Sequence, residues 1–242
     1  MKKWIVPWLA ALAVISSACA FNFNNDAGVV VGSGRLVDKQ FAYTDFTRVE
    51  VGFGARAALV QGSAYATTVT IDDNAVENLI VEQRGDLLYI GLKGGSYRNV
   101  TLRVHITMPA LAGLTLSGGA RATLTGFRSS SDFTLNASGG SNLSGDLEAG
   151  DVNLTLSGGS QLTLKGAGKR LTLNASGGSP VDLTDFVSAG DARVVLSGGS
   201  RANIHLKGRL DADLSGGAQL RYKGSPTLGQ IHSSGGSQIS SH

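Results

Sequence analysis

The sequence predicts an all-β fold, a β-solenoid of the parallel β-helix kind in which an irregular β region precedes regular rungs. Two observations carry this prediction. Apolar and polar residues alternate over short segments, and the tripeptide Ser-Gly-Gly recurs at intervals of 18 to 21 residues. The tripeptides begin at Ser117, Ser138, Ser157, Ser176, Ser197, Ser215 and Ser234. A β-rich repeat near twenty residues is typical of a solenoid, in which each rung buries its apolar side against its neighbours.

The alternation has the same phase in every rung. Residues five, three and one positions before each serine are apolar, and those four and two positions before it are mostly polar. In two of the rungs the apolar positions are Phe133, Leu135, Ala137 and Leu171, Leu173, Ala175. This pattern indicates a strand with one buried face, and a second alternating run after each tripeptide indicates a second strand. We expect Leu154, Leu173 and Val194 to stack in one buried ladder.

The paired glycines predict a sharp corner between the two strands. Glycine adopts a positive φ without penalty and lets neighbouring backbones approach closely. The residue after each pair is Ser or Ala, which is small enough for similar corners to stack. The opposite corner varies in length, from Lys165–Lys169 in one rung to Thr184–Gly190 in another. This variation accounts for the uneven spacing of the repeats.

Before the repeats the predicted strands are longer and less regular. β-rich, partly alternating segments cover residues 47–51, 56–60, 67–71, 79–83, 87–92 and 101–107. Arg84-Gly85-Asp86 is typical of a tight connection, and Asp73–Leu79 is the one stretch that favours a helical turn. We therefore expect a single domain over residues 35–242, with clear repeats in 114–242.

The first twenty residues are typical of an export signal, with basic Lys2-Lys3, an apolar stretch and a small-residue exit. Cys19, the only cysteine, follows that stretch and resembles the lipid-acceptor cysteine of bacterial lipoproteins. The alternative is ordinary cleavage after Ala20, at an A-x-A site. We expect a signal peptide over residues 1–20, lipid attachment at Cys19, and a polar tether over residues 21–34.

The mature chain carries a series of short motifs in a recognisable order. They are Gly32-Ser33-Gly34-Arg35, Phe46–Val51, Leu88-Tyr89-Ile90, Leu102–Pro109 and Leu114–Gly119. Over about residues 32–242 they resemble the bacterial family of putative auto-transporter adhesin head domains, also called head GIN domains or DUF2807. The resemblance implies a β-helix-like fold, an exported or envelope-anchored location, and no established enzymatic activity. It supplies no catalytic or binding residues.

The sequence contains no motif that is typical of an enzyme active site. The sequence lacks G-x-S-x-G and the P-loop pattern, and its histidines lack metal-ligand spacing. His105, which lies in a predicted strand, is interpreted as a half-buried structural residue. A repeated acidic position is interrupted by arginines, which favours a solvated, charge-balanced corner over paired catalytic carboxylates. The residues at this position are Asp132, Asp151, Arg170, Asp191 and Arg209.

The charge distribution predicts no nucleic-acid partner. Without Lys2 and Lys3 the chain has 19 basic residues against 18 acidic ones. Arg121, Arg201 and Arg221 are isolated among Gln, Asn and Thr, and the tyrosines form no evident stacking platform. We expect no cofactor, no metal and no catalytic residue. No ligand-binding residue can be assigned from the sequence.

These observations favour a non-catalytic structural or adhesion module of the bacterial cell envelope. We expect its partners to be the membrane, through the lipid anchor, and an envelope glycan or protein. One alternative is a polysaccharide-binding or polysaccharide-active β-helix protein. Another is a self-assembling solenoid, because the end of a solenoid exposes an unpaired strand edge unless it is capped.

Overall fold

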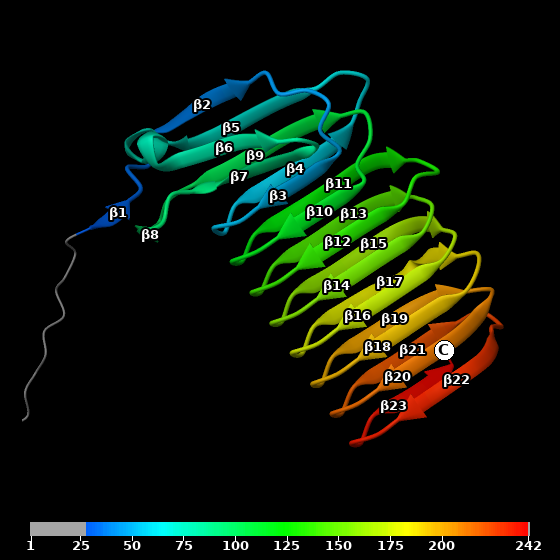
Figure 1. The fold of residues 1–242 in the computed structure, drawn as a ribbon. Helices are drawn as coiled ribbons and strands as arrows, with labels where there is room; N and C mark the ends of the chain where they lie inside the picture. Colours follow the sequence, from blue (N-terminus) through cyan, green and yellow to red (C-terminus); the bar gives the residue numbers. More distant parts are fainter. Residues whose placement is uncertain (1–27, 242) are drawn as a thin grey trace, which may run out of the picture.

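The computed structural model describes residues 28–241, which form a rod of stacked rungs (Figure 1). The N-terminal strands lie at one end of the rod and the C-terminal strands at the other. Two long sheets run along the rod and enclose one apolar core. The structure therefore confirms the predicted β-solenoid with an irregular N-terminal region. The expected signal peptide and its Cys19 lie outside the described residues.

The first sheet contains ten strands and the second contains eleven. In spatial order the first consists of β22 (Thr227–Ser233), β20 (Arg209–Leu214), β18 (Ala192–Leu196), β16 (Leu171–Ala175), β14 (Val152–Leu156), β12 (Phe133–Ala137), β10 (Gly113–Leu116), β3 (Arg48–Val51), β7 (Leu87–Leu92) and β6 (Leu79–Arg84). The second consists of β2 (Leu36–Phe41), β5 (Ala66–Asp72), β9 (Leu102–Met108), β4 (Arg56–Gln61), β11 (Arg121–Arg128), β13 (Asn142–Glu148), β15 (Gln161–Gly168), β17 (Pro180–Ser188), β19 (Arg201–Leu206), β21 (Gln219–Lys223) and β23 (Gln238–Ser241).

The strands of the repeats pair in parallel, and their inward residues form ladders. Leu154 is the register partner of Leu173, which is the register partner of Val194. Each of these side chains is at most 1 % exposed. The predicted ladder is confirmed, because the alternating pattern fixes which face of each strand is buried and the repeat fixes which rung it contacts.

The Ser-Gly-Gly corners join the two sheets by tight turns. In Ser157-Gly158-Gly159-Ser160 both glycines have positive φ, 60° and 75°, and the Ser160 amide donates to the Ser157 carbonyl at 3.2 Å. Positive φ at both central residues is the signature of a type I′ turn. The Ser160 hydroxyl also donates to the Ser157 carbonyl, at 2.8 Å. Stacked corners are bonded too, since the Gly140 amide donates to the Gly158 carbonyl at 3.0 Å.

The two glycines of a corner have different steric surroundings. A Cβ atom on Gly177 would lie 3.0 Å from the backbone nitrogen of Gly158 in the preceding rung, whereas one on Gly178 would have nothing within 4 Å. The corner Gly52-Phe53-Gly54-Ala55 carries Phe53 at the first-glycine position, with φ 57°. In the first sheet, the neighbour of β3 on the side away from the repeats is β7, which leads into the long 93–101 connection and not into a tight corner. No glycine corner therefore stacks against Phe53 on that side, and a side chain fits there.

The N-terminal end is closed by antiparallel strands. β2 pairs antiparallel with β5, β5 with β9, and β6 with β7. The turn between β6 and β7 lies at the predicted Arg84-Gly85-Asp86 connection. The helix η1 (Asp73–Asn78) confirms the predicted helical turn. It is the one helix among residues 28–241, where no helix is long and apolar enough to cross a membrane.

Residues 28–34 lie in the range for which a tether is expected, and the structure holds them against this end. β1 (Val29–Val31) pairs in parallel with β8 (Ser96–Arg98). The buried carboxylate of Asp72 accepts hydrogen bonds from the amides of Gly34 and Thr101, both at 2.6 Å. Backbone pairing and this carboxylate together explain why a polar, glycine-containing segment is ordered.

The variable corners are balanced by ion pairs, as the repeat alignment predicts. Arg170 forms an ion pair with Asp151 of the preceding rung. The Asp151 amide in turn donates to the carboxylate of Asp132 at 2.8 Å. The hydrogen bond from Arg170 lowers the pKa of Asp151 below its ordinary value of 3.8. Asp151 therefore connects neighbouring rungs as an ionised group.

Leu173→Asp should unfold the middle of the solenoid. The substitution places a carboxylate without a partner in a fully buried ladder, at an expected cost of about 3–5 kcal/mol. Asn174→Asp, which adds the same charge on the exposed face of the same strand, is the control. Chemical denaturation of both variants measures the difference, and equal stability of the two would contradict the assigned register.

Gly177→Ala should destabilise the fold more than Gly178→Ala. Both substitutions place an L-residue at positive φ, which costs about 1–2 kcal/mol. The first adds a close contact with the backbone of the neighbouring rung, and the second does not. The free energy of unfolding of each variant tests this order. The reverse order would show that the corners do not stack as described.

Asp151→Asn should lower stability at neutral pH and lose this effect in acid. Because the folded-state pKa of Asp151 is lowered, its ion pair stabilises the fold above about pH 4, and this contribution is lost as the pH falls through the folded-state value. Denaturation of both proteins across this range measures the difference. The pair is solvent-exposed, so the effect should shrink at high salt. A difference that persists at the lowest pH would contradict this account.

Candidate functional site

Three arginines from separate parts of the sequence lie side by side on the outer face of the second sheet. Arg103 of β9 is the register partner of Arg56 of β4, which is the register partner of Arg121 of β11. All three side chains are exposed. We call these residues the arginine row. Adjacent strands are about 4.8 Å apart, so the row concentrates three positive charges along about 10 Å of sheet.

Within residues 28–241 no carboxylate pairs with the arginine row. Arg48, by contrast, binds Asp86 through two hydrogen bonds, at 2.9 and 2.6 Å. Thr70 of β5 is the register partner of Arg103, and Asp38 of β2 is the register partner of Thr70. Asp38 is the first acidic residue along this line, and its carboxylate accepts a hydrogen bond from the Thr70 hydroxyl at 2.6 Å. Like charges directly opposite one another on neighbouring strands destabilise a sheet. The row therefore costs stability and leaves hydrogen-bond donors free for an anion.

Two hollows flank the arginine row, and all three arginines line both of them. The larger has a volume of about 580 Å³ and the smaller about 330 Å³. The larger hollow lies over Ala58, which is the register partner of His105 on one side and of Thr123 on the other. Because the Ala58 side chain is shorter than its two neighbours, the surface of the sheet is concave there. His105 is exposed at this hollow. The interpretation of His105 as half-buried is wrong, since it occupies an outward position of β9.

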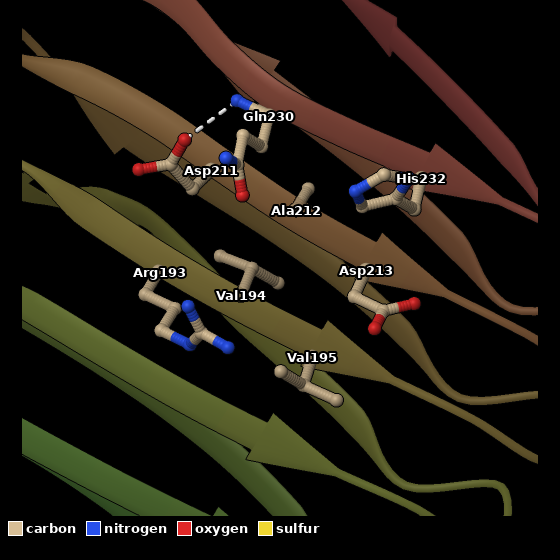
Figure 2. Close-up of a pocket in the computed structure, with 8 residues that line it drawn as sticks. All are labelled: Arg193, Val194, Val195, Asp211, Ala212, Asp213, Gln230 and His232. Atoms are coloured by element: carbon tan, nitrogen blue, oxygen red, sulfur yellow. Dashed lines mark hydrogen bonds between the residues drawn. The ribbon is translucent and has the colours of Figure 1, made fainter.

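A third hollow lies on the outer face of the first sheet, near the C-terminal end (Figure 2). Its volume of about 50 Å³ has room for a few water molecules. Figure 2 shows Asp211 and Arg193 toward one end, and Asp213 with His232 toward the other. The two carboxylates share one face of β20, as their spacing of two residues suggests. The hollow is too small to hold a sugar ring.

Asp211 in this hollow is already bound on two sides. Its carboxylate accepts hydrogen bonds from the Arg209 side chain, at 2.9 and 3.1 Å, and from the backbone N–H of Gln230 at 2.6 Å. These bonds, that from Arg209 above all, lower the pKa of Asp211. A general acid needs a carboxyl that stays protonated near neutral pH. Asp211 is held in the opposite state and serves as an anchor between rungs.

The structure does not bring His105 and His232 together. His105 lies on the second sheet and His232 on the first, toward opposite ends of the rod. In the part of the chain that the structure describes, no three His, Cys, Asp or Glu side chains gather as metal ligands. The charge-balanced corner is confirmed at the two arginines of the repeat position, because Arg170 pairs with Asp151 and Arg209 pairs with Asp211 at 2.9 Å.

The alignment of the repeats did not predict the arginine row, because it contains only Arg121 of the three and shows that residue as isolated. Arg56 and Arg103 precede the Ser-Gly-Gly repeats, so the alignment does not reach them. One signal was present in the sequence. The corner Gly52–Ala55 precedes Arg56 just as Ser117–Ala120 precedes Arg121. Recognising that variant corner would have placed Arg56 beside Arg121, although nothing in the repeat would have placed Arg103.

Solved structures of bacterial proteins share this fold over nearly their whole length. A putative adhesin from Bacteroides fragilis matches with a TM-score of 0.80 and 19% identity, covering 88% of this chain and 100% of that one. One from Parabacteroides merdae matches with a TM-score of 0.70 and 20% identity, covering 89% and 100%. A putative lipid binding protein from Parabacteroides distasonis matches with a TM-score of 0.70 and 18% identity, covering 88% and 99%. At these identities the likeness establishes the fold alone.

The family can be assigned from the sequence itself. No curated protein matches the chain. A family model does match, from residue 45 to residue 226, and this range includes part of the N-terminal region and most of the repeats. The chain therefore belongs to the DUF2807 family, described as the putative auto-transporter adhesin, head GIN domain.

Proposed function

We propose that this protein is an exported, non-catalytic adhesion module that binds its partner through the outer face of the second sheet. The observation that carries the proposal is the arginine row between two hollows. Three cationic side chains, which have no acidic partner among residues 28–241 and are fixed in register on a rigid surface, provide a recognition site at a cost to the fold. Membership of a family described as adhesin heads supports the adhesive role and a location outside the cytoplasm.

The solenoid suits such a role because its surface is already organised. Every strand of the second sheet between β4 and β21 pairs on both sides with a neighbour. Outward side chains at equivalent positions therefore keep their spacing before any ligand arrives. A preorganised surface loses little conformational entropy on binding, which increases the affinity that a given set of contacts provides.

The state of the acidic side chains supports a non-catalytic role. Cleavage of a polysaccharide by two carboxylates requires one with a raised pKa to act as the acid. Asp86, Asp151 and Asp211 each bind an arginine, and hydrogen bonds from these arginines lower all three pKa values. These carboxylates are used to hold the fold together. The state of these carboxylates therefore favours binding of a partner over cleavage of a polysaccharide.

Cys19 is proposed to anchor the module to a membrane by covalent lipid. The supporting observation is the position of this single cysteine after the apolar signal segment. Attached acyl chains supply the membrane affinity of lipidated proteins. The rod would then be held at its N-terminal side, with the rungs extending from the bilayer surface.

Cys19→Ala should release the protein from membranes and reduce the adhesion of cells that produce it. Metabolic labelling with a fatty acid should mark the wild-type chain and leave the variant unmarked. In the same cells, retention on surfaces coated with envelope or extracellular glycans should fall with the variant, because the module no longer links the cell to the surface. An unlabelled wild-type protein would contradict the anchor.

Adhesion and catalysis can be separated in the same assay. Equal retention of cells with and without the wild-type protein would contradict the proposed function. Release of sugar fragments from the coated surface, above the level in cells that lack the protein, would replace adhesion with polysaccharide cleavage. We expect retention without such release.

A further inference from the structure

We propose that the arginine row and the larger hollow bind an anionic polysaccharide. The guanidinium groups of Arg103, Arg56 and Arg121 would hold its acidic groups, and the hollow would receive a sugar ring. This inference rests on the proposed function and names the class of its ligand.

The geometry of the row favours a polymer over a single ion. An arginine side chain binds a carboxylate, phosphate or sulfate through two parallel hydrogen bonds. The row spans about 10 Å across three strands, and one small anion would leave part of it unsatisfied. A chain with repeated acidic groups can contact several arginines at once. Binding would also screen the repulsion among the three neighbouring charges.

The larger hollow has the size and lining expected for a sugar. Its volume of about 580 Å³ lies within the usual range for small-molecule sites, about 300–1,000 Å³. The small apolar side chain of Ala58 contributes to its lining, together with hydroxyl, amide and imidazole groups that can bond sugar hydroxyls. These polar residues are Thr70, His105, Thr123, Asn142 and Ser144.

The same lining argues against nucleic acid and against a membrane surface. Single-stranded nucleic acid is usually held by aromatic side chains that stack on its bases, and neither hollow contains Phe, Tyr or Trp. Insertion into lipid requires exposed apolar side chains. Among residues 28–241 the large exposed apolar side chains are Val31, Leu36, Phe53 and Leu228, and they line neither hollow. A hydroxyl-rich polyanion fits the surface better than either.

Binding of the full chain to defined polymers tests the inference. The probes are polygalacturonate, dextran sulfate and neutral dextran, with phosphatidylglycerol vesicles and single-stranded DNA as competing ligand classes. We expect binding to at least one of the two acidic polysaccharides and none to neutral dextran. Binding should weaken as salt rises, because exposed charges are screened.

Arg56→Gln, at the centre of the row, should weaken this binding about tenfold or more, as expected for losing hydrogen bonds to a charged group. Glutamine is a compatible residue because Gln161 and Gln219 occupy the same register position in later rungs. Arg201→Gln is the matched control, since Arg201 shares this register position but neighbours Pro180 and Gln219. It should leave binding nearly unchanged. Arg56→Lys, which keeps the charge and loses the planar fork, should fall between these two variants.

Thermal unfolding separates loss of binding from loss of fold. Removing one of three neighbouring like charges should leave the melting temperature of Arg56→Gln unchanged or raise it by about 1 °C. Weak binding together with a lowered melting temperature would show a structural role for Arg56 and overturn the inference. Equal losses of binding in Arg56→Gln and Arg201→Gln would also overturn it, because net charge alone would then explain the affinity.

The remaining outcomes distinguish failure of this inference from failure of the proposed function. Tighter binding to vesicles or DNA than to either acidic polysaccharide would overturn the ligand class. If cells carrying Arg56→Gln adhere like wild type and acidic polysaccharides do not compete, the inference fails and adhesion stands. If cells with the wild-type protein do not adhere at all, the proposed function itself fails.

Discussion

The close stacking of the corners is the constraint on which the rest of the structure depends. In the stacked corners the first glycine leaves little room for a side chain, since a Cβ on Gly139, Gly158 or Gly177 would lie 3.0 to 3.3 Å from a backbone nitrogen of the rung before it. Phe53 can occupy the same position in the first corner of the stack, because no tight corner lies beside it on the N-terminal side. Where backbones approach this closely, each rung must take the register of its neighbour. The apolar ladders then follow from the alternation of each strand.

A fixed register also decides how surface charges meet. At the variable corners it places Arg170 beside Asp151 of the previous rung, which lowers the pKa of the aspartate and connects the rungs. On the second sheet the same rule places Arg103, Arg56 and Arg121 next to one another. Opposite charges in neighbouring strands support the fold, and like charges oppose it. The first arrangement needs no ligand, whereas the second is relieved by one.

The regular part of this fold could be predicted residue by residue, because one alternating pattern and one corner repeat there. The six strands expected before the repeats are also confirmed, within a few residues at their ends. β2 was missed because most of its residues are exposed and give no alternation. The antiparallel pairing at the N-terminal end was missed as well. Strand order there depends on tertiary packing, and local sequence carries no signal for it, which is why Arg103 could not be placed beside Arg56.

That dependence explains why the candidate site lies at the junction of the two regions. β9 follows β4 in the sequence, yet it inserts between β4 and β5, parallel to the first and antiparallel to the second. Only this insertion brings Arg103 to the row and His105 to the hollow. The repeats supply Arg121 and a stable surface against which β4 pairs. Recognition is thus assembled where the irregular strands meet the solenoid, since there the sequence is free of the repeat and can place like charges together.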